Sequence, residues 1–198
     1  MGNTIKLPLR NLDASVIHDL QEKYPEAEVS VELHPDRQQG PLSENHFWEL
    51  IALFDWSHED KDDDAVVEPA VTRLAAGPMR HIFEFADVLS KKLYALDGRI
   101  YAEQIGQSAW SPDRYFSVDN FLYARCCVVA NGQDLYEQVL HQPDLFPKDV
   151  TFETLLYIPA MAYERKTGQE WDYIAAFPIE TYSNEAAWNT DSVSQKLL

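Results

Sequence analysis

Apolar residues recur at helical spacing through most of the chain beyond residue 43. Between residues 78 and 98 the apolar positions lie three and four residues apart, which places them on one side of a helix. These positions are Met79, Ile82, Ala86, Leu89, Leu93 and Leu96. Similar spacing predicts further helices over 44–56, 65–77, 119–132, 133–141 and 152–168. The pattern therefore predicts a mainly α-helical domain.

The first 36 residues follow a different pattern. In "TIKLPLR" (4–10) and "AEVSVEL" (27–33), apolar and polar residues alternate, as they do in a half-buried strand. The segment between them, "LDASVIHDLQEKYP" (12–25), has the spacing of a short helix. Strand, helix and strand predict a small β-α-β unit, which needs a larger neighbour for stability. The predicted fold class is α+β, mainly α, with a helical bundle-like domain preceded by this unit.

Changes in composition divide the chain into four parts. Residues 1–36 form the predicted β-α-β extension, and residues 37–45, rich in Pro, Gly and polar residues, form a linker. Residues 46–170 make up the predicted helical domain. Residues 171–198 mix aromatic residues with turn formers and predict a strap over the helices that ends in a tail.

Charge excludes several classes of function. The chain has 33 acidic and 16 basic residues and a net charge of −17, whereas nucleic-acid phosphates and anionic membrane surfaces require clustered Lys and Arg.

No apolar run has the length of a membrane span, and the first residues lack the apolar segment of a secretion signal. The adjacent Cys126 and Cys127 are poorly placed to bridge each other and indicate reduced, buried thiols. We therefore expect a cytoplasmic protein with no cofactor, and the sequence predicts no oligomeric state.

The most apolar stretch, "DNFLYARCCVVANG" (119–132), contains an arginine near its middle. On a helical wheel, Arg125 lies between Phe121 and Val129, on the apolar side. Its guanidinium either extends to the edge of the apolar surface or is buried and paired, since an unpaired buried charge is costly. A buried pair would fix how two helices meet.

Two carboxylates are candidate partners for Arg125. Asp97 lies at the edge of the apolar stripe of residues 78–98 and near the C-terminus of that helix, where a negative charge is unfavourable without a partner. Asp55, which lies between Ile51 and Trp48 on its own predicted helix, is the second candidate. Asp97 is the first choice.

Four phrases resemble one known family when they are taken as an ordered set. They are "FWELIALFDW", "FLYARCCVVANGQDLYEQVL", "YIPAMAYERKTG" and "SNEAAW", and together they span roughly residues 44–188. The set resembles a bacterial domain of unknown function, the one numbered 4240. The resemblance implies a mostly helical bacterial domain with no established activity, and it assigns no catalytic or ligand residues.

An acidic run at residues 58–68 invites comparison with a calcium loop. Asp60, Asp62 and Asp64 have the one-three-five spacing, but Ala65 replaces the required Gly, and Val71 stands where a bidentate Glu is needed. The six histidines show no zinc-helix spacing, and no nucleophile elbow or phosphate-binding loop occurs. The sequence therefore predicts no metal site and no catalytic residue.

Two functional hypotheses remain. The first is a non-enzymatic acidic interaction module, regulatory, scaffolding or immunity-type, that receives a basic protein partner. Its candidate surface combines the acidic run with aromatics at element ends: Asp60, Asp62, Asp63, Asp64, Trp56, Trp110, Trp171 and Trp188. The second is an enzyme or small-molecule binder with a polar pocket around Arg125. Its candidate residues are Arg125, Asp97, Asp55, Tyr123, Tyr163, Glu164 and Arg165. The absence of a catalytic motif favours the first.

Overall fold

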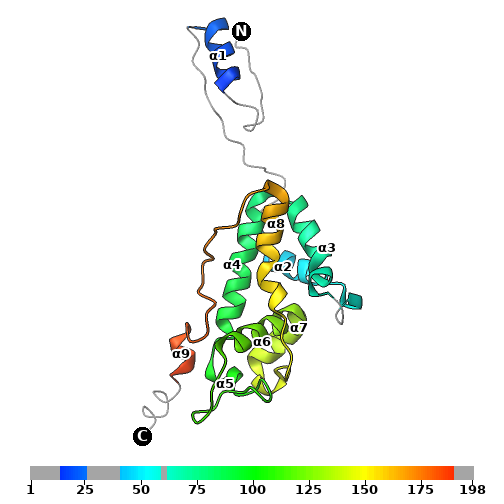
Figure 1. Cartoon of the computed structure of the whole chain (residues 1–198), viewed down its shortest axis with the longest axis vertical. Coiled ribbons are helices and arrows are strands. Elements are labelled where there is room, and N and C mark those ends of the chain that lie inside the picture. The colour runs from blue at the N-terminus through cyan, green and yellow to red at the C-terminus, as the bar shows by residue number, and fades with distance from the viewer. Residues whose placement is uncertain (1–13, 26–40, 59–61, 190–198) are drawn as a thin grey trace. The chain divides into compact units, whose positions relative to one another are not determined.

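A computed structural model of the chain describes residues 14–25, 41–58 and 62–189. By its internal contacts the chain divides into two units, Met1–Arg37 and Gln38–Leu198. In the first unit the described element is helix α1 (Ala14–Lys23). The second unit contains the other described helices, which Figure 1 labels in chain order.

The predicted N-terminal β-α-β unit, and with it the α+β class, is wrong. The described residues form helices and contain no strand. Helix α1 occupies the predicted helical middle of the unit, whereas the two predicted strand segments, 4–10 and 27–33, lie outside the described residues. Alternation alone does not specify a sheet, because two short strands need a third or a packed helix to be stable. Helix α1 offers little apolar cover, since Ile17 is exposed and Leu20 only half-buried.

The prediction of a mainly α-helical domain is confirmed for the second unit. Short 3-10 turns (η) join several of its helices. In order, the elements are α2 (Glu44–Ile51), η2 (Trp56–His58), α3 (Asp63–Ala76), α4 (Met79–Ala95), α5 (Arg99–Ala102), α6 (Val118–Ala130), α7 (Gln133–His141), η3 (Pro143–Leu145), η4 (Glu153–Tyr157), α8 (Ile158–Thr167) and α9 (Glu185–Trp188).

The core of this unit lies among α3, α4, α6 and α8. Helix α8 packs against α3 and α4, and α6 packs against α4, α7 and η4. The predicted apolar stripe of α4 faces this core, with Ile82, Leu93 and Leu96 fully buried. Burying such side chains stabilises the fold by roughly 1.5–3 kcal/mol each relative to leaving them in water.

Helix α6 is buried on nearly all sides. Ser117 caps it by accepting a hydrogen bond from the amide of Asn120, at 3.2 Å. Beyond its first turn, every residue from Ala124 to Ala130 is buried. A helix that is apolar all round belongs at the centre of a domain, so a charged residue on it has little access to water.

A left-handed residue ends the last long helix and directs the chain onto the surface of α4. Gly168 adopts φ 70°, a conformation that glycine tolerates without steric cost. The following residues, 169–189, form an extended segment that ends in α9, and we call this segment the strap. In Figure 1 the strap runs beside α4 along its length. Its hydrogen bonds to residues 87–97 confirm this contact.

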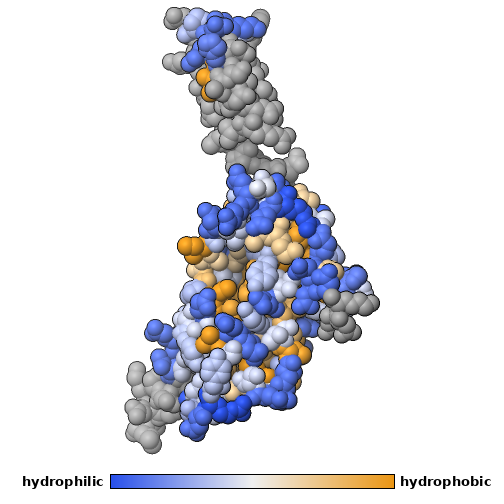
Figure 2. All heavy atoms as spheres, in the orientation of Figure 1, coloured by the Kyte–Doolittle hydropathy of each residue, from blue (hydrophilic) through white to orange (hydrophobic). Residues whose placement is uncertain are grey.

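The surface of the described helices mixes polar and apolar side chains. Figure 2 shows hydrophobic residues among hydrophilic ones on the visible face of the second unit. Within the described residues, none of the helices combines the length and the apolar character that crossing a membrane requires.

Candidate functional site

Arg125 is fully buried, with 0% of its surface exposed. Its Nη1 donates to the carbonyl oxygen of Leu93 at 2.9 Å. Its Nη2 donates to the carbonyl oxygen of Ile179 at 2.9 Å and to Oγ1 of Thr181 at 3.1 Å. Its guanidinium carbon also lies 4.9 Å from the centre of the Phe121 ring, a cation–π distance. The side chain thus joins α6 to α4 and to the strap.

Burial determines the electrostatics of Arg125. Removal from water lowers the pKa of its guanidinium, and the negative charge of Asp97 opposes this shift. Its Nε donates no hydrogen bond. The direct partners of this buried cation are neutral oxygens, so its charge is balanced by carboxylates at longer range.

Asp97 is also fully buried, at the C-terminal end of α4. Its carboxylate accepts hydrogen bonds from the amide of Tyr182 at 3.2 Å, the amide of Asn184 at 2.9 Å and Nε1 of Trp188 at 2.8 Å. A negative charge is unfavourable at the C-terminal end of α4, and these three hydrogen-bond donors stabilise the carboxylate there. All three come from the strap.

The structure brings Arg125 and Asp97 to the same segment, although their hydrogen bonds do not join them to each other. Within the described residues, Arg125 donates to main-chain and hydroxyl oxygens, and Asp97 accepts only from the strap. The second candidate partner, Asp55, lies elsewhere. Its exposed carboxylate accepts from the amide of Ser57 at 3.1 Å, and hydrogen bonding to Ser57 lowers the pKa of Asp55.

The remaining candidate pocket residues lie at two other places. Tyr123 contacts Glu153 on the surface of α6 and η4, and the hydrogen bond to Glu153 raises the pKa of Tyr123. Tyr163, on α8, packs against Trp171 of the strap and against Phe83 on α4. Glu164 is exposed. These positions do not form one pocket around Arg125.

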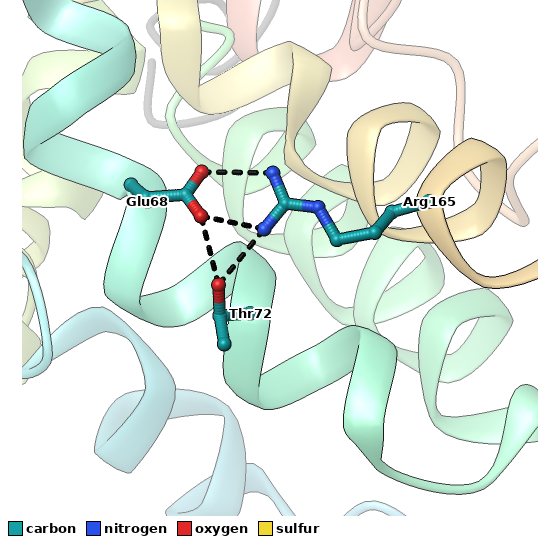
Figure 3. A network of polar contacts seen from close by, with 3 residues as sticks. All are labelled: Glu68, Thr72 and Arg165. Carbon is teal, nitrogen blue, oxygen red and sulfur yellow. Dashed lines mark hydrogen bonds and ion pairs between the residues drawn. The ribbon is translucent and has the colours of Figure 1, made fainter.

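Arg165 forms a forked ion pair between α8 and α3 (Figure 3). Its Nη1 and Nη2 lie 2.6 and 2.8 Å from the two carboxylate oxygens of Glu68. Nη1 also donates to Thr72 Oγ1 at 2.8 Å, and this hydroxyl donates to Glu68 at 2.8 Å. The pair raises the pKa of Arg165 and lowers that of Glu68. Its geometry fixes the register of two packed helices.

The acidic run forms the beginning of α3. Asp62 caps this helix, because its Oδ1 accepts from the amides of Asp64 and Ala65 at 3.1 and 3.3 Å. Asp63 and Asp64 occupy the first turn and are exposed. Asp60 lies outside the described residues. Of the candidate tryptophans, Trp56 lies beside this run, on η2.

The other candidate tryptophans pack in two separate aromatic groups. The ring centres of Trp110 and Trp188 lie 6.4 Å apart, and Trp188 also packs against Phe116. Trp171 stacks on Phe83, with a centre distance of 5.5 Å. The structure therefore does not join the four tryptophans into one surface.

Of the residues that hold the strap, Asp97 was a predicted candidate, whereas Asp87, Ser90 and Tyr94 were not. Asp87, Ser90, Tyr94 and Asp97 lie three, four and three residues apart, on a second side of α4 that is polar. This spacing was a readable signal for a polar contact along the helix. The main-chain carbonyls through which the strap accepts hydrogen bonds cannot be identified from residue types in the sequence.

A small polar cavity lies between the loop after α5 and the loop before η4. Its volume is about 240 Å³, below the range of roughly 300–1,000 Å³ that suits drug-sized ligands. Its lining includes Gln107, Asn120 and Asp149. Oδ1 of Asp149 accepts from the amide of Gln107 at 2.7 Å, so the carboxylate fixes the loop. Arg125 is not in its lining.

Comparison with known proteins gives one family match, and it covers much of the region in which the resemblance was found. A family model described as "Protein of unknown function (DUF4240)" matches residues 42–165, which is more than half of the chain. The match contains Asp87, Asp97 and Arg125 and ends before the strap. No curated protein and no solved structure matches the chain. The predicted resemblance is confirmed over residues 42–165, whereas the fourth phrase, "SNEAAW" (183–188), lies beyond the match. The chain belongs to the DUF4240 family of proteins of unknown function.

Proposed function

We propose that this protein is a non-enzymatic interaction module, of regulatory, scaffolding or immunity type, that receives a basic protein partner on an acidic surface. This acidic surface consists of Leu53, Asp55, Trp56, Asp62, Asp63 and Asp64, between the end of α2 and the first turn of α3. The observation that carries the proposal is that exposed apolar side chains on and before η2 lie beside the exposed carboxylates at the start of α3.

Local structure explains how these groups come together. The amide of Asp55 donates to the carbonyl oxygen of Val66 at 2.9 Å, and the amide of Asp62 donates to the carbonyl oxygen of His58 at 3.1 Å. These bonds hold η2 beside α3. Leu53 and Trp56 remain 41% and 36% exposed there, although Trp56 also packs on Phe152.

The charges of this surface favour a cationic partner. Among the described residues, no Lys or Arg pairs with Asp63 or Asp64, whereas Glu44 and Glu68 are paired with Lys92 and Arg165. The chain as a whole carries −17, so a basic protein is attracted before contact. The apolar Trp56 and Leu53 provide area that a partner could remove from water.

The second hypothesis, a pocket around Arg125, receives less support. It required a cavity in which the guanidinium lacks protein partners. Arg125 instead donates to Leu93, Ile179 and Thr181 beneath the strap. The guanidinium therefore has protein partners, contrary to what this hypothesis required.

The proposal is tested by affinity capture from the native host with the purified full chain as bait. We expect a basic protein to be retained at low salt, and its purified form to bind with an affinity that falls as salt rises. The variant D63N/D64N keeps the Asp62 cap and removes two charges. We expect it to weaken binding by tenfold or more, about 1.4 kcal/mol.

The matched control is D113N/D144N, which removes two exposed charges elsewhere. It should bind the partner as the wild type does. Retention of no protein at low salt would count against the proposal. Equal loss of binding in both double variants would show that net charge, and not this surface, attracts the partner.

A further inference from the structure

The strap is an extended segment that lies on the helices with one side. From Trp171 to Tyr182, half-buried and exposed residues alternate without a break. Trp171, Tyr173, Phe177 and Thr181 are among those that face inward. This period of two is that of a β-strand, although no other strand pairs with it among the described residues.

Helix α4 binds the main chain of the strap through a line of polar groups. The amide of Ala176 donates to Asp87 Oδ1 at 2.8 Å, and the amide of Phe177 donates to Ser90 Oγ at 3.3 Å. Asp97 accepts the amides of Tyr182 and Asn184 further along. The helix thus supplies acceptors for amides that a sheet would otherwise pair.

Helix α6 supplies the complementary donor. Arg125 binds the carbonyl oxygen of Ile179 and the hydroxyl of Thr181, and that hydroxyl donates to the carbonyl oxygen of Val118 at 2.8 Å. We call Asp87, Ser90, Tyr94, Asp97 and Arg125 the strap-binding surface. It recognises both amides and carbonyls of one extended segment.

Alternate side chains of the strap enter aromatic contacts. Trp171 and Tyr173 pack against Phe83, and the ring of Phe177 lies 5.6 Å from that of Tyr94. Main-chain hydrogen bonds combined with contacts of alternate side chains are a recurring mode of peptide recognition. The strap-binding surface therefore has the chemistry of a peptide-binding site.

Two features of the backbone indicate that the strap can leave as a unit. Tyr182 adopts φ 76°, a left-handed conformation that costs a bulky residue roughly 1–3 kcal/mol. Asp97, which holds the amide of Tyr182, and Trp188, whose ring centre lies 4.3 Å from that of Tyr182, maintain this conformation. At the other end, Gly168 provides a bend before the strap begins.

The family match includes residues of the strap-binding surface but does not include the strap. Asp87, Asp97 and Arg125 lie within the matched residues 42–165, and the strap lies beyond them. A buried charge on a family domain is thus satisfied by a segment that the family model does not include.

We propose that the strap-binding surface is a peptide-binding site that the strap occupies within its own chain, and that the strap of a second copy of this chain can occupy it in its place. Such an exchange creates no new type of contact, because the same segment enters the same site. The proposal goes beyond the acidic surface, which lies on η2 and α3 and takes no part in it.

Two full-chain variants test this exchange by complementation. The first, T181V/W188A, weakens the strap and keeps the strap-binding surface intact. The second, D97N, weakens the surface and keeps the strap intact. Neither variant alone has both halves of the contact, so we expect each to remain monomeric. Their mixture should form a heterodimer, at about tenfold or more above either homodimer in native mass spectrometry.

The control mixture combines T181V/W188A with D97N that also carries T181V/W188A. It offers no intact strap and should give no heterodimer. Absence of a heterodimer in the first mixture, with both variants helical by circular dichroism, would overturn the proposal.

A measurement on the wild type keeps the proposal falsifiable if a variant does not fold. Hydrogen exchange should be faster at the amides of Ala176, Phe177, Tyr182 and Asn184 than at the interior of α4, by about 100-fold, because the strap opens by itself. Exchange of these four amides only through global unfolding would show that the strap does not leave separately, and it would refute the inference.

Discussion

Arg125 and Asp97 hold the same segment through opposite hydrogen-bonding roles. Arg125 donates to the carbonyl oxygen of Ile179, and Asp97 accepts the amide of Tyr182, three residues further along. Each is fully buried, and each carries a charge that the other helps to balance across the strap. The strap thus binds both a buried cation on α6 and a buried anion at the end of α4, and it adds to the direct bond from Arg125 to Leu93 that joins the two helices.

Replacing Arg125 by Met is expected to destabilise the fold. Methionine fills a similar volume but leaves Leu93 O and Ile179 O without their donor. Part of the loss is offset, because a buried charge no longer has to be desolvated. We expect the free energy of unfolding to fall by roughly 2–3 kcal/mol in urea titration.

The matched control for this change is R73M, because Arg73 is exposed on α3. It should alter the free energy of unfolding by less than about 0.5 kcal/mol. Equal stability of the two variants would contradict the burial and hydrogen bonding of Arg125.

Replacing Asp97 by Asn is expected to loosen the strap. The amide keeps one acceptor oxygen but turns a donor toward the amides of Tyr182 and Asn184 and the indole of Trp188. The cost should be about 1–3 kcal/mol, and limited proteolysis should cut within 169–189 sooner than in the wild type. D172N, at an exposed strap residue, should behave like the wild type. Unchanged proteolysis of D97N would mean that other contacts hold the strap.

Sequence patterns indicated that Arg125 lies on an apolar side of its helix, but not what it binds. Helical spacing specifies direction around one helix, and α6 is buried nearly all round. Two of the acceptors of Arg125 lie 32 and 54 residues away and are main-chain carbonyls, which every residue has. Such partners follow from the course of the chain and cannot be read from residue identities.

The N-terminal strands were wrong, and the candidate pocket residues lie apart, for a related reason. Alternation within 4–10 and 27–33 describes one side of a segment, whereas a sheet requires partners that local sequence does not supply. Tyr163 and Arg165 were grouped with Arg125 through sequence character alone. The structure places them on α8, where Arg165 pairs with Glu68.

The ion pair between Arg165 and Glu68 is expected to contribute modestly and to depend on pH. Hydrogen bonding to Arg165 lowers the pKa of Glu68 below its ordinary value of 4.5. Its contribution is therefore present above pH 4.5 and is lost as the pH falls through the folded-state pKa. Both side chains are partly exposed, so a double-mutant cycle with R165M and E68Q should give about 1 kcal/mol or less at pH 7.

The same cycle at high salt and along a falling pH series is its internal control. The coupling should fall at high salt because the charges are screened, and it should fall as the pH drops through the folded-state pKa of Glu68 because the carboxylate is then protonated. A coupling that persists at high salt would assign the contact to Thr72 or to packing, and not to charge.

The two cysteines are expected to resist thiol reagents in the native protein. Both are buried and neither forms a disulfide, and burial raises the pKa of Cys126 because the thiolate is disfavoured away from water. A disulfide reagent at pH 8 should therefore react about 100-fold more slowly with the native chain than with the chain in denaturant. Rapid labelling of the native protein would show that α6 is open to solvent, contrary to the packing around it.

Glu153 is expected to control the ionisation of two tyrosines on the surface of α6 and η4. The hydroxyl of Tyr157 donates to the carboxylate of Glu153, and this hydrogen bond raises the pKa of Tyr157 to about 12. Glu153 also raises the pKa of Tyr123. In E153Q the charge is removed, so tyrosinate absorbance should appear at lower pH for these two residues.

The sign of the pH effect on stability follows from the same contact. A folded-state pKa above the unfolded value of 10.0 stabilises the fold below pH 10, and that contribution is lost as the pH rises through about 12. Y157F identifies the part of the titration that belongs to Tyr157, and E170Q, at an exposed strap residue, is the matched control. If E153Q and E170Q titrate alike, Glu153 does not hold the two phenols, and the contact between η4 and α6 must be maintained by apolar packing.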